Sequence, residues 1–349
     1  MNKNIKLNDF LMKILNGTAL AIVVGLMPNA ILGGIFSHLS GHNEFFESIS
    51  YMLLMAQAAT PVLVGLAIGY QFKLQAMETA IIGAVCIIGS GQLIPSEQGL
   101  IARGIGDLIN TMLAGGLAVY LLSLIRGKLG SLTIILSVLL GVMIPGIISI
   151  FTLPYVKQIT TGLGTIIQNF TNLQPLIMSI LLCVSFSLIV ISPISAVAIA
   201  YAIGIDGLAS GAANLGVVST TAVLMISSIY VNKIGIPISL FLGSTKMYMP
   251  HWLKNPIINI PLVINAIING ISAYIFNIHG TTASAGFGYT GLAGPINAWS
   301  FMQGSPISKT IPLLLAYLVI PFATAYIIEI LCTKTLKLYS RDIFIFNQE

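Results

Sequence analysis

The sequence predicts an all-α polytopic membrane protein with about ten transmembrane helices and additional broken or re-entrant helices. Hydrophobic residues make up 56% of the 349 residues and charged residues only 7%, whereas about 25% of the residues of a typical soluble domain are charged. This length has room for about ten spans of about 20 residues each, and no room for a sizeable soluble domain. Proline, glycine and asparagine interrupt the apolar segments of the second half, which predicts broken helices there.

Nine apolar segments have the length and hydrophobicity of a span. The expected spans are Thr18–Phe36, Tyr51–Tyr70, Met77–Ile94, Ile105–Leu124, Leu132–Phe151, Leu176–Ile191, Gly207–Tyr230, Asn255–Phe276 and Ile311–Cys332. Two further segments, Ile194–Ile205 and Ala283–Trp299, are too short or too rich in glycine to cross simply. We expect them to form half-helices or re-entrant hairpins, which are tolerated in a membrane only when they are buried in protein or line a cavity.

Basic residues predict the orientation of these spans. Over the first half, six basic residues precede the first span or lie in connections assigned to the inside, and two, Arg103 and Lys157, lie outside. This excess on one side follows the positive-inside rule. We therefore expect a membrane protein whose N- and C-termini are both cytoplasmic.

The chain is expected to divide into three regions. Residues 1–152 contain fairly straight spans and are expected to be mainly scaffold and dimerisation helices. Residues 153–174 are less apolar and are expected to form an amphipathic connector at the membrane surface. Residues 175–349 carry the broken helices and are expected to form the substrate-carrying region.

Polar residues concentrate around one stretch, Lys254–Trp299. Four asparagines, Asn255, Asn259, Asn265 and Asn269, lie in an apolar segment, and each unpaired amide in hydrocarbon would cost several kcal/mol. The two pairs of asparagines are each spaced by four residues, which places each pair on one helical face. Amides both donate and accept hydrogen bonds and therefore suit a ligand covered in hydroxyls, whereas the alternative role is hydrogen bonding between helices.

The remaining candidate substrate-binding residues are polar groups next to prolines, glycines or helix breaks. His279, Thr281 and Thr282 lie in the glycine-rich break, and an imidazole can donate to or accept from a sugar hydroxyl. The others are Asn29, Gln57 and Asn214.

Four acidic residues lie close to or within the apolar segments. Interfacial solvation accounts for Glu78 and Asp107, helix capping is expected for Asp206, and Glu329 is expected to pair with Lys334.

The sequence contains no motif typical of metal binding, redox chemistry or catalysis. The cysteines Cys86, Cys183 and Cys332 each lie alone in an apolar stretch, without metal or redox spacing, and are read as buried hydrophobic residues. No phosphate-binding loop, metal-ligand cluster or nucleophile elbow is present, and the glycines of 286–291 do not follow a strand as a dinucleotide fingerprint requires. We expect no autonomous active site, no cofactor or metal, and no nucleic acid as a partner.

Three stretches resemble a known family. These are Gly17–Gly33, Asn255–Asn265 and Gly280–Pro295, and they are similar to the perfringolysin O regulator-like branch of the phosphotransferase-system (PTS) IIC permeases. The resemblance covers nearly the whole chain. It implies the glucose-type IIC fold, a homodimer with a scaffold domain and a transport domain, and an elevator-like movement that carries sugar across the membrane.

The resemblance also implies roles for particular residues. His279 corresponds to a sugar-contacting histidine, whereas the stretch Asn255–Pro261 corresponds to an Asn-Glu-Pro-like motif and lacks its glutamate. Phosphorylation of a sugar hydroxyl requires a base within hydrogen-bond reach, and asparagine cannot serve as one.

The leading function is therefore a permease of the PTS IIC type for a sugar or similar polyhydroxylated solute. At most, the chain would be the membrane component of a sugar phosphotransferase, with separate IIA and IIB proteins as partners. Two alternatives stay open: a membrane-embedded regulator or sensor without transport, and a small-metabolite carrier that works without phosphorylation.

Overall fold

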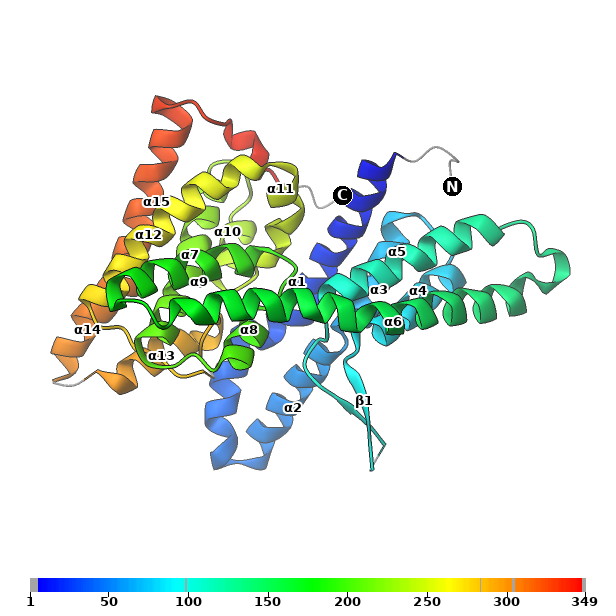
Figure 1. Ribbon diagram of the computed structural model, residues 1–349, viewed down its shortest axis with the longest axis horizontal. Helices are drawn as coiled ribbons and strands as arrows, with labels where there is room; N and C mark the ends of the chain where they lie inside the picture. The colour runs from blue at the N-terminus through cyan, green and yellow to red at the C-terminus, as the bar shows by residue number, and fades with distance from the viewer. Residues whose placement is uncertain (1–5, 98, 283, 303–304, 347–349) are drawn as a thin grey trace. The chain divides into compact units, whose positions relative to one another are not determined.

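The computed structural model describes residues 6–97, 99–282, 284–302 and 305–346, and is made of helices with one short hairpin of strands (Figure 1). Contacts divide the chain into a first unit, Met1–Asn29 with Leu39–Ile159, and a second unit, Ala30–His38 with Thr160–Glu349. The α-helices are α1 (Leu7–Leu39), α2 (Glu44–Ala58), α3 (Thr60–Gln71), α4 (Ala76–Ser90), α5 (Leu108–Ile125), α6 (Thr133–Phe170), α7 (Pro175–Ile191), α8 (Ala196–Ile203), α9 (Gly207–Ile229), α10 (Gly235–Phe241), α11 (Met249–Lys254), α12 (Asn259–Ile275), α13 (Ala293–Phe301), α14 (Pro306–Leu314) and α15 (Ile320–Ile330).

Six stretches of helix in the described residues are long and apolar enough to cross a membrane. They are Leu7–Asn29, Leu108–Ile125, Thr133–Phe170, Gly207–Ile229, Pro256–Ile275 and Pro306–Thr335. Helices α2 and α3, which are bent by 43° at their junction, make a seventh if they are counted as one broken span, and α4 and α7 are shorter apolar helices. The predicted all-α class and the membrane character are confirmed, and the number of about ten spans stays a prediction.

Short polar side chains begin several of these helices. The Asp107 carboxylate accepts from the backbone N–H of Asn110 at 2.8 Å and caps α5. The Ser195 hydroxyl accepts from the N–H of Ala198 at 3.1 Å and caps α8. Asp206 caps α9 in the same manner. Each cap satisfies a backbone donor that the first turn of a helix leaves without an intrahelical partner, so both aspartates have a structural role at a helix end.

In the first unit, helices α3, α4 and α5 pack closely because small residues line their contacts. A Cβ atom built at Gly65 of α3 would lie 2.5 Å from the Cα of Gly83 in α4, so a side chain at that position would force the two helices apart. Glu78 is buried and accepts from the N–H of Gln75 at 3.1 Å, completing a capping box at the start of α4. Its carboxylate also pairs with Arg126 at 3.2 Å.

A buried amide links three helices of the first unit. The side chain of Asn110 in α5 is fully buried and donates to the carbonyl oxygens of Gly89 in α4 at 2.6 Å and Ser149 in α6 at 2.8 Å. Its own oxygen accepts from the Thr152 hydroxyl at 2.7 Å. Asn110 thus satisfies three polar groups in an apolar interior.

Two parts of the first half of the chain differ from the sequence-based expectation. Strands β1 (Leu93–Ser96) and β2 (Gly99–Ala102) form an antiparallel hairpin in a region that was expected only as an outer connection. The expected connector, 153–174, lies for most of its length inside α6, which is 38 residues long and contains Pro145 and Pro154. The contact boundary between the two units falls within α6, at 159/160.

In the second unit, α7 and α9 lie side by side and run in the same direction (Figure 1). Cys183 of α7 faces Gly216 of α9, where a built Cβ would lie 2.3 Å from the cysteine carbonyl oxygen. One turn further on, the hydroxyls of Ser187 and Thr220 are 2.7 Å apart. Because α7 and α9 run in the same direction, the chain must pass back from the end of α7 to the start of α9. The segment 192–206, which contains α8, makes this return.

Helices α12 and α15 complete the bundle of the second unit. Helix α12 runs opposite to α9, because Asn265 donates to the carbonyl of Ser219 at 3.0 Å while Gly270, further along α12, packs against the earlier part of α7 at Ile180. Helix α15 packs on α9 and α12. The core of the unit is a cluster of buried residues from α7, α8, α9 and α12 and from the segments around residues 278–298 and 316–317.

We expect Asn110→Ala to destabilise the first unit. The substitution removes the hydrogen bonds to the carbonyls of Gly89 and Ser149 and the bond from the Thr152 hydroxyl, each worth about 0.5–1.5 kcal/mol. The melting temperature of the purified protein in detergent should fall by several degrees, whereas Asn169→Ala, at an exposed position of α6, should leave it within error. Equal melting temperatures for the two variants would contradict the role assigned to Asn110.

Candidate functional site

Two interruptions of the helical bundle meet in the second unit. The first break, 192–206, separates α7 from α9 and contains α8, and the second break, 276–292, separates α12 from α13. They are joined by backbone pairing, because Gly207 at the start of α9 and Gly280 in the second break donate to each other's carbonyl oxygens at 3.0 Å. An isolated pair of strand-like hydrogen bonds therefore connects two segments that are more than seventy residues apart in sequence.

Side-chain hydroxyls strengthen this junction. Thr282 donates to the carbonyl oxygen of Ile205 at 2.9 Å, and Ser210 of α9 donates to the carbonyl oxygen of Thr281 at 2.8 Å. The Thr281 hydroxyl in turn donates to Asn297 of α13 at 3.0 Å. Both predicted threonines thus lie where the two breaks meet. Thr282 joins the breaks through its hydroxyl, whereas the Thr281 hydroxyl bonds to α13 and its carbonyl oxygen accepts from α9.

Two glycines allow the breaks to approach this closely. A Cβ built at Gly211 would lie 1.7 Å from the carbonyl oxygen of Ile278, which is far inside van der Waals contact. Gly286 has a φ of +81°, and a Cβ there would lie 3.0 Å from the carbonyl carbon of Ala196 at the start of α8. Any side chain at either position would push the second break away from α9 or α8.

His279 directly precedes the bridging Gly280. Its side chain is half-buried, and its ring stands edge-on to that of Phe301 at a centroid distance of 6.3 Å. Among the residues that the structure describes, the imidazole has no hydrogen-bond partner. A half-buried imidazole with both ring nitrogens available is suited to recognise a hydroxyl.

Asn265 and Asn269 are fully buried and bond within the protein. Besides Ser219, Asn265 donates to the carbonyl oxygen of Pro321 in α15 at 3.3 Å and accepts from the hydroxyl of Thr324. Asn269 donates to the carbonyl oxygen of Asn265 at 2.8 Å. Asn265 therefore has the interhelical role that was the alternative to ligand binding, whereas Asn269 bonds within α12.

Asn255 and Asn259 lie at the other end of α12 from His279. Asn259 begins α12 and accepts from the indole N–H of Trp252 at 2.7 Å, and Asn255 donates to the carbonyl oxygen of His251 at 3.1 Å. Helix α12 has 17 residues, so about 25 Å of helix, at 1.5 Å per residue, separates these amides from the second break. The asparagines of α12 and His279 are not gathered around one point in this structure.

The three other predicted residues are Asn29 and Gln57, in the first unit, and Asn214, in the second. Asn29 of α1 donates to Gln57 at the end of α2, so these two amides pair with each other in the first unit. Asn214 lies in the second unit, fully buried in α9, and accepts from the backbone N–H of Gly288 in the second break at 3.1 Å. Asn214, His279, Thr281 and Thr282 therefore form the part of the predicted set that the structure brings to the junction of the breaks.

Asp206 and Glu329, two carboxylates of the second unit, have partners within the protein. Asp206 is exposed and caps α9. Glu329 is buried at the far end of α15, where its pairing partner is Arg341 at 3.0 Å and not the expected Lys334. Ser227 and Tyr339 also donate to Glu329, at 2.7 and 3.1 Å. Among the described residues, no carboxylate contacts His279.

Sequence reasoning missed one cation. Lys246 lies between α10 and α11, outside the six candidate spans, and its ammonium donates to the carbonyl oxygens of Ser192 and, at 2.7 Å, Ile194 in the first break. A positive charge at the carboxyl end of α7 also complements the helix dipole. Burial lowers the pKa of Lys246 to about 7. A lysine that follows Ser244 and Thr245 in a short connection gives no local signal of such a contact.

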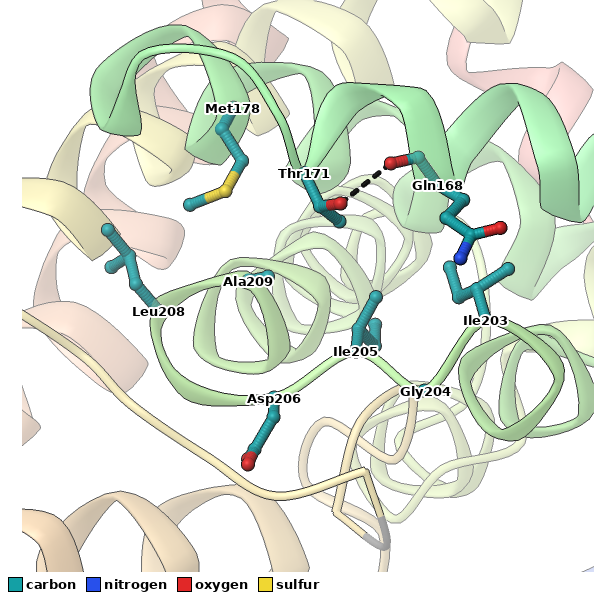
Figure 2. A pocket seen from close by; sticks show the side chains of 9 residues that line it. All are labelled: Gln168, Thr171, Met178, Ile203, Gly204, Ile205, Asp206, Leu208 and Ala209. Carbon is teal, nitrogen blue, oxygen red and sulfur yellow. Dashed lines mark hydrogen bonds between the residues drawn. The ribbon is translucent and has the colours of Figure 1, made fainter.

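A pocket of about 260 Å³ lies at the start of α9 (Figure 2). Its polar side chains are Gln168 and Thr171 of α6 and the turn after it, while Asp206 points away from them. The pocket is smaller than the roughly 300–1,000 Å³ of typical ligand sites, and none of the predicted site residues lines it. We therefore place the candidate site at the junction of the breaks and not in this pocket.

The comparison with protein families agrees with this architecture. Residues 12–346 match the family described as Phosphotransferase system, EIIC, and the chain belongs to that family. It is thus an integral membrane protein of the PTS, and the family implies a sugar substrate and IIA and IIB partners. No curated protein and no solved structure matches the chain. The predicted family is confirmed, whereas the perfringolysin O regulator-like branch stays a prediction.

Gly211→Ala should disrupt the junction of the two breaks. The added methyl group overlaps the Ile278 carbonyl, and overpacking of this kind costs about 1–3 kcal/mol. We expect a lower melting temperature and faster proteolytic cleavage within the second break. Gly162→Ala in α6 is the matched control, because nothing lies within 4 Å of a Cβ there, and alanine favours a helix by up to about 1 kcal/mol. A Gly211→Ala variant as stable as Gly162→Ala would contradict the contact.

Lys246 should make stability depend on pH. The folded pKa is about 7, below the value of about 10.4 for an unfolded chain, so between these values the unfolded state binds the additional proton. The free energy of unfolding attributable to Lys246 therefore rises as the pH increases from 7 to 10. The melting temperature of the wild type minus that of Lys246→Met should increase over this range, while the difference for Lys233→Met, an exposed position, should stay flat. A difference that does not change with pH for Lys246→Met would refute the shift.

Proposed function

We propose that the second unit binds a sugar or similar polyhydroxylated solute and carries it across the bacterial inner membrane by an elevator-like alternating-access mechanism. The observation that carries the proposal is the junction of two helix breaks in an otherwise apolar helical unit, in a chain of the EIIC family. Transporters commonly bind their solutes at broken helices, whose backbone groups are not all used within the helix.

The groups at the junction fit a neutral solute with several hydroxyls. His279 offers an imidazole without a hydrogen-bond partner among the described residues, and Asn214, Thr281 and Thr282 add an amide and two hydroxyls near backbone carbonyls. The imidazole and the amino group of Asn214 can donate, and the two threonine hydroxyls, which already donate within the protein, can accept from the hydroxyls of a sugar. We further propose a homodimer with both termini in the cytoplasm, and separate IIA and IIB proteins as partners.

Phosphorylation in transit is the less supported part of this function. The motif-like stretch Asn255–Pro261 has no glutamate, Asp206 and Glu329 have capping and pairing roles, and His279 has no carboxylate neighbour among the described residues. This arrangement favours, as a second candidate, a carrier that works without phosphorylation. A regulator without transport is favoured by a different observation, namely that Asn265 is engaged between helices.

Uptake into proteoliposomes would separate these functions. The purified wild type is assayed against a panel of labelled sugars and small organic acids, with and without the soluble phosphotransferase proteins. We expect flux for at least one sugar, and a decrease of about tenfold or more in His279→Ala, because the variant loses the one half-buried imidazole of the junction. Thr165→Ala, an exposed residue of α6, is the control and should transport like the wild type.

Each outcome assigns a function. Flux that requires the soluble proteins supports phosphorylation-coupled uptake, and flux without them supports the carrier. A folded protein that transports none of the solutes would refute transport and favour the regulator. Full activity of His279→Ala would remove His279 from the site while leaving transport in place.

A further inference from the structure

The first break begins with two carbonyl groups that no backbone donor satisfies. Helix α7 ends at Ile191, and Pro193, which has no N–H, prevents the helix from continuing. Within the described residues, the carbonyl oxygens of Ser192 and Ile194 accept from no backbone N–H. A carbonyl left without a partner in an apolar interior is costly, so this turn requires a donor from another part of the chain.

The turn presents both oxygens in a fixed arrangement. The Ser192 hydroxyl donates to the carbonyl oxygen of Ile189 at 2.7 Å and accepts from the N–H of Ile194 at 3.2 Å. The next residue, Ser195, caps α8. The turn is therefore closed by its own side chains, and its two remaining carbonyl oxygens both accept from one atom, the Nζ of Lys246.

Lys246 brings a positive charge to these oxygens without an opposite charge beside it. The turn Thr245–Tyr248, which carries the lysine, packs against α7, α9 and α10, and no ion pair between described residues includes Lys246. Carbonyl dipoles therefore balance the charge. In secondary transporters, carbonyl groups of unwound segments and helix C-termini coordinate Na⁺, and Lys246 places an ammonium where such an ion would bind.

The backbone that carries the lysine has a fixed position. Met247 is 2% exposed and Tyr248 is fully buried, and the Tyr248 hydroxyl donates to the carbonyl oxygen of Phe344 at 2.8 Å. The N–H of Met249 bonds to the carbonyl oxygen of Lys246 itself. The ammonium is thus held at one end by a packed turn and at the other by the two carbonyl oxygens.

The residues that follow this contact touch the second break. Ala196 comes two residues after Ile194, and a Cβ built at Gly286 of the second break would lie 3.0 Å from the Ala196 carbonyl carbon. Thr282 bonds to the far end of the first break. The first break is therefore tied to the second break near its middle and at its end, and to Lys246 at its beginning. A displacement of 192–194 would shift Ala196 against Gly286.

We infer that the carbonyl oxygens of Ser192 and Ile194 form a site for a monovalent cation, which the chain fills with the ammonium of Lys246, and that this internal cation holds the first break where the junction binds solute. Lys246 is a positioning residue in this arrangement, because it acts on the solute only through the two breaks. The cation site stands by itself, whereas the effect on solute binding rests on the proposed function.

Chemical rescue tests the cation site. Lys246→Ala removes three carbons and the nitrogen, and propylammonium consists of the same heavy atoms. At about pH 6, below the pKa of about 7 of Lys246, the wild-type side chain and the free amine are both charged. The melting temperature of Lys246→Ala in detergent should lie below that of the wild type. It should rise by about 2 °C or more in about 100 mM propylammonium, because a ligand that binds the folded state stabilises it.

Three controls separate charge from other effects. Tetramethylammonium carries the same charge but has no N–H, and n-propanol has a similar size but no charge, so neither should raise the melting temperature of Lys246→Ala to the same extent. Lys233→Ala, which truncates an exposed lysine, should not respond to propylammonium. The wild type should not respond either, because its site is already filled.

Uptake by Lys246→Met tests the positioning role. Methionine keeps most of the volume of the side chain and removes the ammonium. With the solute that the wild type transports, the concentration for half-maximal uptake should rise about fivefold or more, as expected when two sites are energetically coupled. A lysine with a structural role alone would lower the melting temperature of Lys246→Met and leave this concentration unchanged.

Distinct results would overturn each part of the inference. Failure of propylammonium to raise the melting temperature of Lys246→Ala, or an equal increase in n-propanol, would refute the cation site. If Lys246→Ala does not fold alone, the three additives are compared during purification, and recovery only in propylammonium supports the site, whereas no recovery in any of them refutes it. A wild-type half-maximal concentration for Lys246→Met would refute the positioning role. Absence of uptake in the wild type refutes the proposed function, and the melting temperatures still decide the cation site.

Discussion

The second unit depends on one constraint, which is that backbone polar groups in an apolar interior must find partners within the protein. A helix meets this requirement by itself, but a break exposes several N–H and C=O groups at once. Here each break supplies partners for the other: Gly207 and Gly280 exchange backbone hydrogen bonds, and Thr282 bonds back to Ile205. If the two breaks separated, these backbone groups would lose their hydrogen bonds. We therefore expect the two segments to move together.

Close approach is the structural condition for this mutual pairing. A backbone can lie directly on a helix only where the helix has no side chain, and Gly211 provides that place beneath Ile278. Gly216 and Gly270 play the same part where α7 meets α9 and α12. The small residues therefore do more than permit bends, because they set the distances at which the hydrogen bonds of the junction form.

The sequence predicted the fold class and the presence of broken helices, but it did not predict which side chains contact one another. The apolar content and the prolines and glycines of the second half predicted an all-α membrane protein with short helices near α8 and α13, because these features act locally. The sequence did not reveal which amides face a solute. Asn265 and Asn269 have the spacing of a polar helical face, but Asn265 bonds to α9 and α15 and Asn269 bonds back to Asn265. Only tertiary contacts distinguish an amide that binds ligand from one that joins helices.

The same limit applies to the groups that sequence reasoning missed. Lys246 contacts carbonyls more than fifty residues earlier in the chain. The β-hairpin at 93–102 lies in a connection whose composition differs little from that of an irregular loop.

The placement of charge favours recognition through neutral dipoles. Glu329 is neutralised by Arg341 and two hydroxyl donors at the far end of α15, and Asp206 is used at a helix start. Lys246 is held by two carbonyls at the end of α7. Apart from Asp206, whose carboxylate caps α9 next to the bridging Gly207, the side chains that the junction brings together are amides, hydroxyls and an imidazole. A polyol exchanges hydrogen bonds with water for hydrogen bonds with such groups at little cost.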